Sequence, residues 1–141
     1  MKALLSIKPE FVEEIIEGRK KFEYRKKVFK RSDISSIVVY ATKPYGKVVG
    51  EFEIETILEE NIDKLWSDTK HLSGISEEFF YEYFKDRDSG FAIQIKKFKE
   101  YNKHLELSEF DSTIKAAPQS FCYIRRYQFG IYFISRCPWC W

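Results

Sequence analysis

The sequence predicts an α+β protein: a small, strongly curved mixed sheet or barrel of five or six strands, with helices packed at its side. Segments with strand-like alternation recur along the chain, and most of the helical periodicity is inserted between them. At 141 residues the chain has the length of one domain. Its 44% hydrophobic and 18% aromatic content is typical of a packed core and argues against general disorder.

The first strand and helix are the most clearly marked. Residues 2–7 alternate loosely and predict a strand. Pro9 suits the first turn of a helix, where its missing N–H would have had no partner. Gly18 suits the left-handed position that ends a helix. Between them one apolar stripe recurs at helical spacing, formed by Phe11, Val12, Ile15 and Ile16.

After Gly18 the apolar period changes from 3.6 to 2, which predicts strands near 22–25, 35–41 and 47–58. Residues 42–46 contain Pro and Gly and predict a tight turn. One face of the predicted strand over 47–58 carries Glu51, Glu53 and Glu55. These carboxylates repel one another unless cations lie opposite, and the basic stretch 19–31 is the expected partner.

The second half predicts a helix over 61–70, a second helix capped by Ser76, and a strand over 91–95. One helical turn is expected over 105–110. A last strand is expected near 122–124, extended through about residue 133.

Positive charge is concentrated in one segment. Residues 19–31 carry eight Lys or Arg and only Glu23 as an acid, a local excess of seven in a chain of net charge +2. This excess indicates either an anionic partner such as a nucleic-acid backbone, or a solvated cationic strand paired with the glutamate row.

Several classes of protein are not indicated. No apolar run approaches the ~20 residues of a membrane span, and the apolar stretch at the N-terminus is too short for a secretory signal. We therefore expect a cytoplasmic protein with reduced cysteines and no membrane partner. The sequence has no Gly-rich phosphate loop, no H-E-x-x-H and no nucleophile elbow, and we expect no cofactor and no metal.

Four strings in order resemble the ASCH domain family, which has a PUA-like barrel. Leu4 to Pro9 and Ile15 to Arg25 resemble its opening strand, helix and Gly-x-Lys-x-x-Glu-x-Arg-like segment. Val39 to Gly50 and Pro118 to Phe121 resemble two later segments. The resemblance implies an ASCH domain over residues 1–124 and a C-terminal extension over 125–141. It also implies a cleft beside the barrel that accepts RNA or a nucleotide, in a family often described as regulators of transcription or translation.

The expected nucleic-acid contacts follow from this resemblance and from the charge pattern. Basic side chains are expected on phosphates, Glu23 and Gln119 on a base edge, and a tyrosine stacked on a base. The expected set is Lys8, Lys21, Glu23, Arg25, Lys26, Tyr40, Lys43, Tyr45, Gln119 and Ser120. Tyr24 and Trp66 are further stacking candidates, although most aromatic residues must lie in the core.

The alternative function is enzymatic. Some small bacterial relatives in the family hydrolyse acetylated cytidine with a Lys, a Thr and a Glu, and a ribonuclease is the other enzymatic alternative. Lys20 matches the position of that Lys, and Glu23 stands where the Thr would be. Catalysis by Lys20 and Glu23 would need a depressed pKa at Lys20, which crowding by Arg19, Lys21 and Arg25 favours.

The extension carries Cys137 and Cys140 in a C-x-x-C. A structural zinc would need further ligands from Cys122, His104 or His71. The simpler interpretation is a hydrophobic terminal segment that packs on the domain or on a second subunit as a homodimer.

Overall fold

The computed structural model describes the backbone of residues 1–126 and 132–136 and the side chains of residues 1–124. Seven strands form one mixed sheet in the order β2-β5-β4-β3-β1-β6-β7, in which β1 and β3 are parallel and all other neighbours antiparallel. The strands are β1 (Lys2–Ile7), β2 (Phe22–Arg25), β3 (Ser36–Ala41), β4 (Lys47–Asn61), β5 (Ser89–Leu105), β6 (Phe121–Arg126) and β7 (Tyr132–Arg136).

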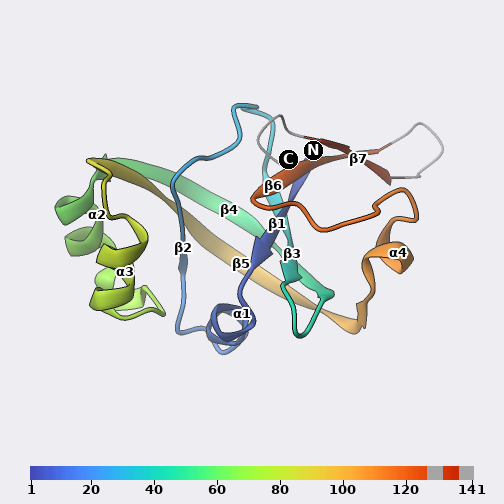
Figure 1. The fold of residues 1–141 in the computed structure, drawn as a ribbon, viewed down its shortest axis with the longest axis horizontal. Coiled ribbons are helices and arrows are strands. Elements are labelled where there is room, and N and C mark those ends of the chain that lie inside the picture. The colour runs from blue at the N-terminus through green and yellow to red at the C-terminus, as the bar shows by residue number, and fades with distance from the viewer. Residues whose placement is uncertain (127–131, 137–141) are drawn as a thin grey trace.

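The α+β class with a mixed sheet and helices at its side is confirmed (Figure 1). The sheet differs from the expectation in two respects. It has seven strands rather than five or six, because the predicted last strand is a hairpin of β6 and β7. No pairing among the described residues joins β2 to β7, so the sheet is open and is not a closed barrel.

Helix α1 (Pro9–Ile16) connects β1 to β2 and follows the predicted pattern. Pro9 opens the helix, and Gly18 lies beyond its C-cap with a φ of 81°. Val12 and Ile15 are buried against the sheet, with Phe11 and Ile16 packed beside them. The helix therefore fixes the direction in which the chain enters residues 18–25.

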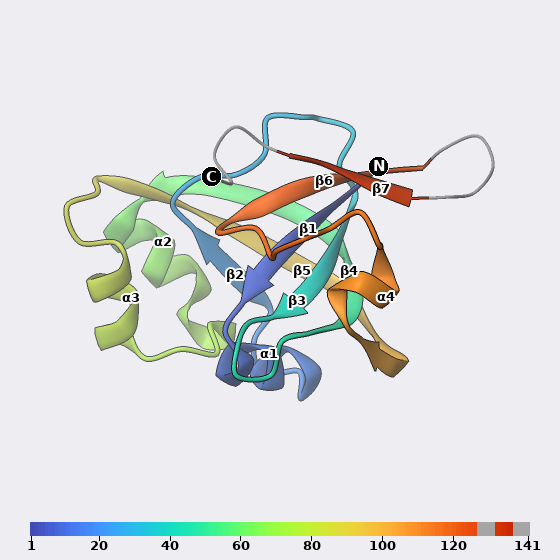
Figure 2. The same ribbon diagram turned by 45° about the vertical axis from the view of Figure 1, so that its right-hand side comes forward.

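The other helices are α2 (Ile62–Thr69), the 3-10 turn η1 (Lys70–Leu72), α3 (Glu77–Tyr83) and α4 (Leu107–Phe110). Asn61 and Ser76 cap α2 and α3 through their side chains, as expected at helix N-termini. α2, η1 and α3 are inserted between β4 and β5. They lie beside the end of the β4–β5 pair where β4 ends and β5 begins (Figure 2). Leu65, Phe80 and Phe84 from this insertion pack against Phe22 and Tyr24 of β2.

The glutamate row of β4 does not face the basic stretch after α1, as the sequence suggested. β4 lies between β3 and β5, so its cross-strand cations come from β5: Lys99 is opposite Glu51, and Lys97 is opposite Glu53. Lys2 Nζ also lies 2.5 Å from Glu51 Oε2. Opposite charges in these positions reduce the repulsion among the β4 glutamates. The cations of residues 20–27 are therefore not needed to neutralise this strand.

Within the described part of the chain, no helix is long and apolar enough to cross a membrane. The predicted boundary after residue 124 stays a prediction, and β6 continues through Arg126.

Candidate nucleic-acid interface

A cavity of about 620 Å³ opens between β2, α1, α3 and the segment that leads into β6. Its basic residues outnumber its acidic ones six to one. The polar residues that line it are Ser6, Lys8, Lys20, Glu23, Arg25, Lys26, Lys27, Thr42, Arg87, Gln119 and Ser120. Aromatic rings complete the wall, namely Phe11, Tyr24, Phe79, Tyr83 and Phe121. The cavity is large enough for a small ligand such as a nucleotide.

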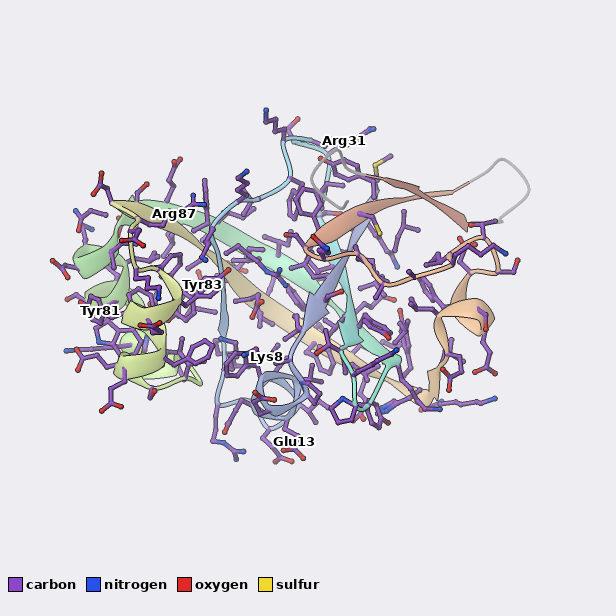
Figure 3. The ribbon with its side chains drawn as sticks, viewed as in Figure 1. Lys8, Glu13, Arg31, Tyr81, Tyr83 and Arg87 are labelled. Atoms are coloured by element: carbon purple, nitrogen blue, oxygen red, sulfur yellow. The ribbon has the colours of Figure 1, made fainter. Side chains whose placement is uncertain are left out.

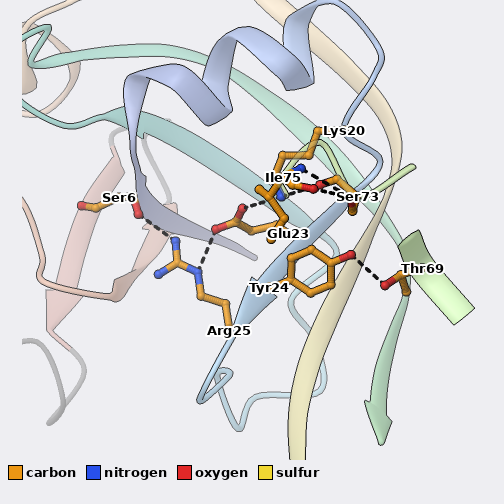
Figure 4. A network of polar contacts seen from close by, with 8 residues as sticks. All are labelled: Ser6, Lys20, Glu23, Tyr24, Arg25, Thr69, Ser73 and Ile75. Carbon is orange, nitrogen blue, oxygen red and sulfur yellow. Dashed lines mark hydrogen bonds and ion pairs between the residues drawn. The ribbon is translucent and has the colours of Figure 1, made fainter. Parts of the chain in front are cut away.

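Lys20 lies at the floor of this cavity and is almost completely buried, with 1% of its side chain exposed. Its Nζ donates a hydrogen bond of 3.0 Å to the carbonyl oxygen of Ser73 and lies 3.8 Å from Glu23 Oε1 (Figure 4). The same Nζ lies 4.8 Å from the centroid of the Tyr24 ring. The amine is held by a carbonyl, a carboxylate and an aromatic face, which are the groups that stabilise a buried ammonium.

Burial lowers the pKa of Lys20 to about 8, against an opposing effect of Glu23 and with a smaller contribution from Arg25. The sequence predicted this direction but attributed it to crowding by cations. The main cause is desolvation, which disfavours the charged amine. At neutral pH a part of the Lys20 population is therefore uncharged and able to accept a proton.

Glu23 is fixed by cations on both sides. Arg25 Nε lies 3.1 Å from Glu23 Oε2, an ion-pair distance without the alignment of a hydrogen bond. Arg25 Nη2 donates to the carbonyl oxygen of Ser6 at 2.7 Å. Since 8% of the Glu23 side chain and 11% of the Arg25 side chain are exposed, this pair is largely desolvated. Its orientation is set by β1 and β2 together.

The wall opposite β2 is formed by residues 118–120, which are far from β1 in the sequence but hydrogen-bonded to it. Ser6 Oγ donates to the carbonyl oxygen of Pro118 at 2.7 Å, and the Ser6 amide donates to the carbonyl oxygen of Ser120. These contacts bring Gln119 and Ser120 to the cavity, as the sequence predicted for the Pro118–Phe121 string.

The mouth of the cavity is formed by lysines that lie on aromatic rings of α3. Lys8 Nζ lies 5.0 Å from the centroid of Phe79, and Lys26 Nζ lies 4.9 Å from the centroid of Tyr83. Both lysines are exposed.

The structure thus brings together seven of the predicted site residues. Lys8, Lys20, Glu23, Arg25, Lys26, Gln119 and Ser120 all line the cavity. Lys21 does not, because β2 begins only at Phe22 and the strand alternation does not extend back to residue 21. It is Lys20, in the turn after Gly18, that points inward.

Three other predicted residues lie elsewhere. Tyr40, Lys43 and Tyr45 line a separate hollow with Glu106 and Lys115, outside the lining of the main cavity. Tyr40 is buried in the core, and the Tyr45 hydroxyl hydrogen-bonds His104. The hairpin 42–46 contributes only Thr42 to the main cavity, because β3 carries its tip away from β2.

The two further stacking candidates belong to the core. The Tyr24 hydroxyl hydrogen-bonds Thr69 Oγ1 at 2.7 Å, and burial raises the pKa of Tyr24 to about 12. Its ring still borders the cavity floor. Trp66 packs on Phe80 with ring centroids 4.8 Å apart.

Sequence reasoning missed Ser6, Phe79, Tyr83 and Arg87. The sequence predicts a helix capped by Ser76, and only the position of α3 across the cavity shows that Phe79 and Tyr83 line it. Arg87 lies four residues beyond the end of α3, in the turn that leads to β5, and no local pattern in the sequence indicates that it reaches the cavity.

No group of three or more His, Cys, Asp or Glu within the described residues is arranged to hold a metal. Cys122 is buried in β6, and Cys137 and Cys140 lie outside the described residues.

Comparison with known proteins gives three related findings. The model of the ASCH domain matches residues 5–121. An "ASCH domain-containing ribonuclease" of Zymomonas mobilis is 29% identical over 94 residues, which cover 67% of this chain and 64% of that protein. The large ribosomal subunit protein uL22 of Ureaplasma parvum is 33% identical over 89 residues, which cover 63% of this chain but 28% of that protein. The chain thus spans less than two thirds of the length of these curated relatives.

The fold is also similar to a solved structure. The crystal structure of the ASCH protein from Zymomonas mobilis superposes with a TM-score of 0.80 at 26% identity. The match covers 88% of this chain and 87% of that one.

Proposed function

The chain belongs to the ASCH domain family, and we propose that it binds single-stranded RNA or a nucleotide in the basic cavity beside β2. The observation that carries this proposal is the composition of the lining. Six Lys or Arg side chains and a single carboxylate surround one hollow in a protein of net charge +2. Such an excess favours phosphates, whose counterions the cations replace.

The roles divide by burial. Lys8, Lys26 and Arg87 are exposed at the mouth, where they can reach phosphates of a strand that remains outside. Glu23 and Arg25 are rigid and desolvated at the floor, where they can pair with the edge of a base. A carboxylate accepts from an amino or imino N–H, so a base with such a donor facing Glu23 is favoured. Through the RNA that it selects, such a domain would act as a regulator of transcription or translation.

The direct test is fluorescence anisotropy of an end-labelled single-stranded RNA at low salt, about 50 mM. A duplex RNA and free nucleoside monophosphates serve as competitors. We expect single-stranded RNA to bind and the monophosphates to displace it, because one unpaired nucleotide enters the cavity. If neither RNA nor nucleotides bind at low salt, the proposal is wrong.

A second candidate function is cleavage of the bound RNA, and the buried amine of Lys20 favours it. With a pKa of about 8, this amine is available as a base near neutral pH. It would remove the proton of a ribose 2′-hydroxyl, whose oxygen then forms a bond to the adjacent phosphorus. The bond from phosphorus to the 5′-oxygen breaks, and that oxygen takes up a proton from the Lys20 ammonium. The Zymomonas relative named a ribonuclease supports this candidate.

Hydrolysis of acetylated cytidine is the rival reaction for the same amine, with water in place of the 2′-hydroxyl. Two assays on wild-type protein and Lys20→Met separate the candidates. Ribonuclease activity yields a 2′,3′-cyclic phosphate and is lost when the target ribose is 2′-deoxy. Amidohydrolase activity releases acetate from acetylated cytidine and does not depend on a phosphate. Binding with neither product leaves RNA binding as the function.

A further inference from the structure

The inner face of α3 carries two aromatic rings in a nearly parallel arrangement. The Phe79 and Tyr83 rings are inclined by 11°, with centroids 6.4 Å apart, and both line the cavity. Edge-on ring contacts hold them in place: Phe11, which also lines the cavity, contacts Phe79 at 5.0 Å between centroids, and the buried Phe84 contacts Tyr83 at 4.8 Å. The two rings therefore form a fixed aromatic surface one helical turn long.

Each of these rings is covered by a lysine from a different segment. Lys8 precedes α1 and lies over Phe79, while Lys26 follows β2 and lies over Tyr83. An exposed cation–π contact contributes only about 0.5–1 kcal/mol. An ammonium group at the mouth of a cavity therefore leaves a ring readily when a phosphate comes within reach.

Tyr83 also lies close to the charged floor. Burial raises the pKa of its hydroxyl, and the charges of Arg25 and Glu23 act on it as well. Tyr81, on the same helix, is 38% exposed and hydrogen-bonds Asp63 on the outer side. Figure 3 shows the two tyrosines on different sides of α3. Of these two tyrosines only Tyr83 lines the cavity, so Tyr81 serves as a matched control.

We propose that Phe79 and Tyr83 form the stacking wall for an unpaired base of RNA, and that Lys8 and Lys26 move from the ring faces to its phosphates. This inference rests on the proposed function and names the residues that accept the base. Phe79 and Tyr83 thus take the stacking role that the sequence assigned to Tyr40 and Tyr45, which lie outside the cavity lining. Stacking on a tyrosine accepts any base, and the edge contacts of Glu23 and Arg25 then select among bases.

The test uses single-stranded RNA with one 2-aminopurine, whose fluorescence falls when it stacks, together with an end label for anisotropy. We expect quenching on binding to wild-type protein, and a roughly 10- to 100-fold weaker affinity without quenching in Tyr83→Leu. Leucine keeps most of the volume without an aromatic face. Tyr83→Phe and Tyr81→Leu should retain both signals, and thermal unfolding confirms that each variant is folded.

An RNA with an abasic site at the 2-aminopurine position completes the cycle. On this RNA the affinity difference between wild type and Tyr83→Leu should disappear, because the lost contact is with the base. If wild-type protein binds RNA but no position quenches, or if Tyr83→Leu binds as tightly as wild type, the stacking wall is wrong while RNA binding stands. If wild-type protein gives no anisotropy change at low salt, the proposed function itself fails and the wall fails with it.

Discussion

Gly74 lies so close to Lys20 that a side chain at position 74 would clash with it. A Cβ atom on Gly74 would come within 2.7 Å of Lys20 Cγ and 2.9 Å of Lys20 Cα. Gly74 also has a φ of 66°, in the left-handed region. The loop after η1 is therefore shaped around the buried amine and presents the Ser73 carbonyl to it.

The first prediction is that Gly74→Ala destabilises the protein and displaces Lys20. Gly18→Ala is the matched control, because Gly18 also has a positive φ but nothing within 4 Å of the added methyl group. We expect about 1 kcal/mol of lost stability for Gly18→Ala from backbone strain alone. Gly74→Ala should lose about 2 kcal/mol more from the clash. Equal losses in urea unfolding would show that the contact with Lys20 is unimportant.

The second prediction concerns the pH dependence of stability. Burial lowers the pKa of Lys20 from 10.5 to about 8, so between these values the folded protein binds fewer protons than the unfolded chain. Stability therefore rises with pH across this window, and below pH 8 the charged amine destabilises the fold by roughly 3 kcal/mol.

Comparison with Lys20→Met isolates this effect, because every other group titrates in both proteins. Between about pH 7 and 10 wild-type protein should gain roughly 2–3 kcal/mol relative to the variant in urea unfolding. Parallel stability curves would contradict the lowered pKa.

The third prediction is that Glu23→Gln is strongly destabilising. It leaves Lys20 and Arg25 buried without a counter-charge, at an expected loss of about 3–5 kcal/mol. Glu53→Gln, at an exposed position of β4, is the control and should change stability by less than about 0.5 kcal/mol. Since the Glu23 charge raises the pKa of Lys20, the variant should also lower that pKa further, as measured by NMR of the side-chain amine.

The fourth prediction concerns salt. Each phosphate contact to single-stranded RNA contributes about 0.7 to the slope of log affinity against log salt. Lys26→Ala plus Arg87→Ala should therefore reduce the slope by about 1.4. Lys85→Ala plus Lys96→Ala removes the same charge at exposed positions away from the cavity, where the two lysines pair with Glu82 and Glu55. If both double variants change the slope equally, the binding is not located in the cavity.

The fifth prediction tests where the sequence and the structure disagree. Lys43 was an expected phosphate contact, but it lies in the separate hollow beside Tyr45. Lys43→Ala should weaken RNA binding less than about twofold, within the range of a distant surface charge. A loss of affinity as large as that of Lys26→Ala would show that the hairpin 42–46 belongs to the RNA-binding surface.

Much of the fold could be predicted because local signals agreed with the tertiary structure. Pro9 and Gly18 bracket α1, and Asn61 and Ser76 cap the next two helices. The 17-residue length of β5 was missed, because Lys96–Lys97 interrupts the apolar alternation beyond Ile95. Bulges in its pairing with β4 allow the strand to continue through that interruption.

The site was partly predictable for a similar reason. The segment from Lys20 to Lys26 is continuous, so its charge excess pointed directly to the cavity. Arg87 and Tyr83 come from an insertion between β4 and β5, and their approach to Glu23 depends on strand order alone. Lys43 lies outside the cavity lining because the path of the hairpin 42–46 depends on the same strand order.

The hydrogen bonds between Ser6 and residues 118–120 have a consequence for synthesis of the protein. The floor residues Lys20, Glu23 and Arg25 are synthesised early, but Ser73 and β5, which hold this segment in place, come later in the chain. The last wall, at Pro118, comes 112 residues after its hydrogen-bond partner Ser6. A nascent chain on the ribosome therefore carries these side chains long before it can enclose a ligand between them. The complete cavity forms only when the Pro118–Phe121 segment leaves the exit tunnel and docks beside β1.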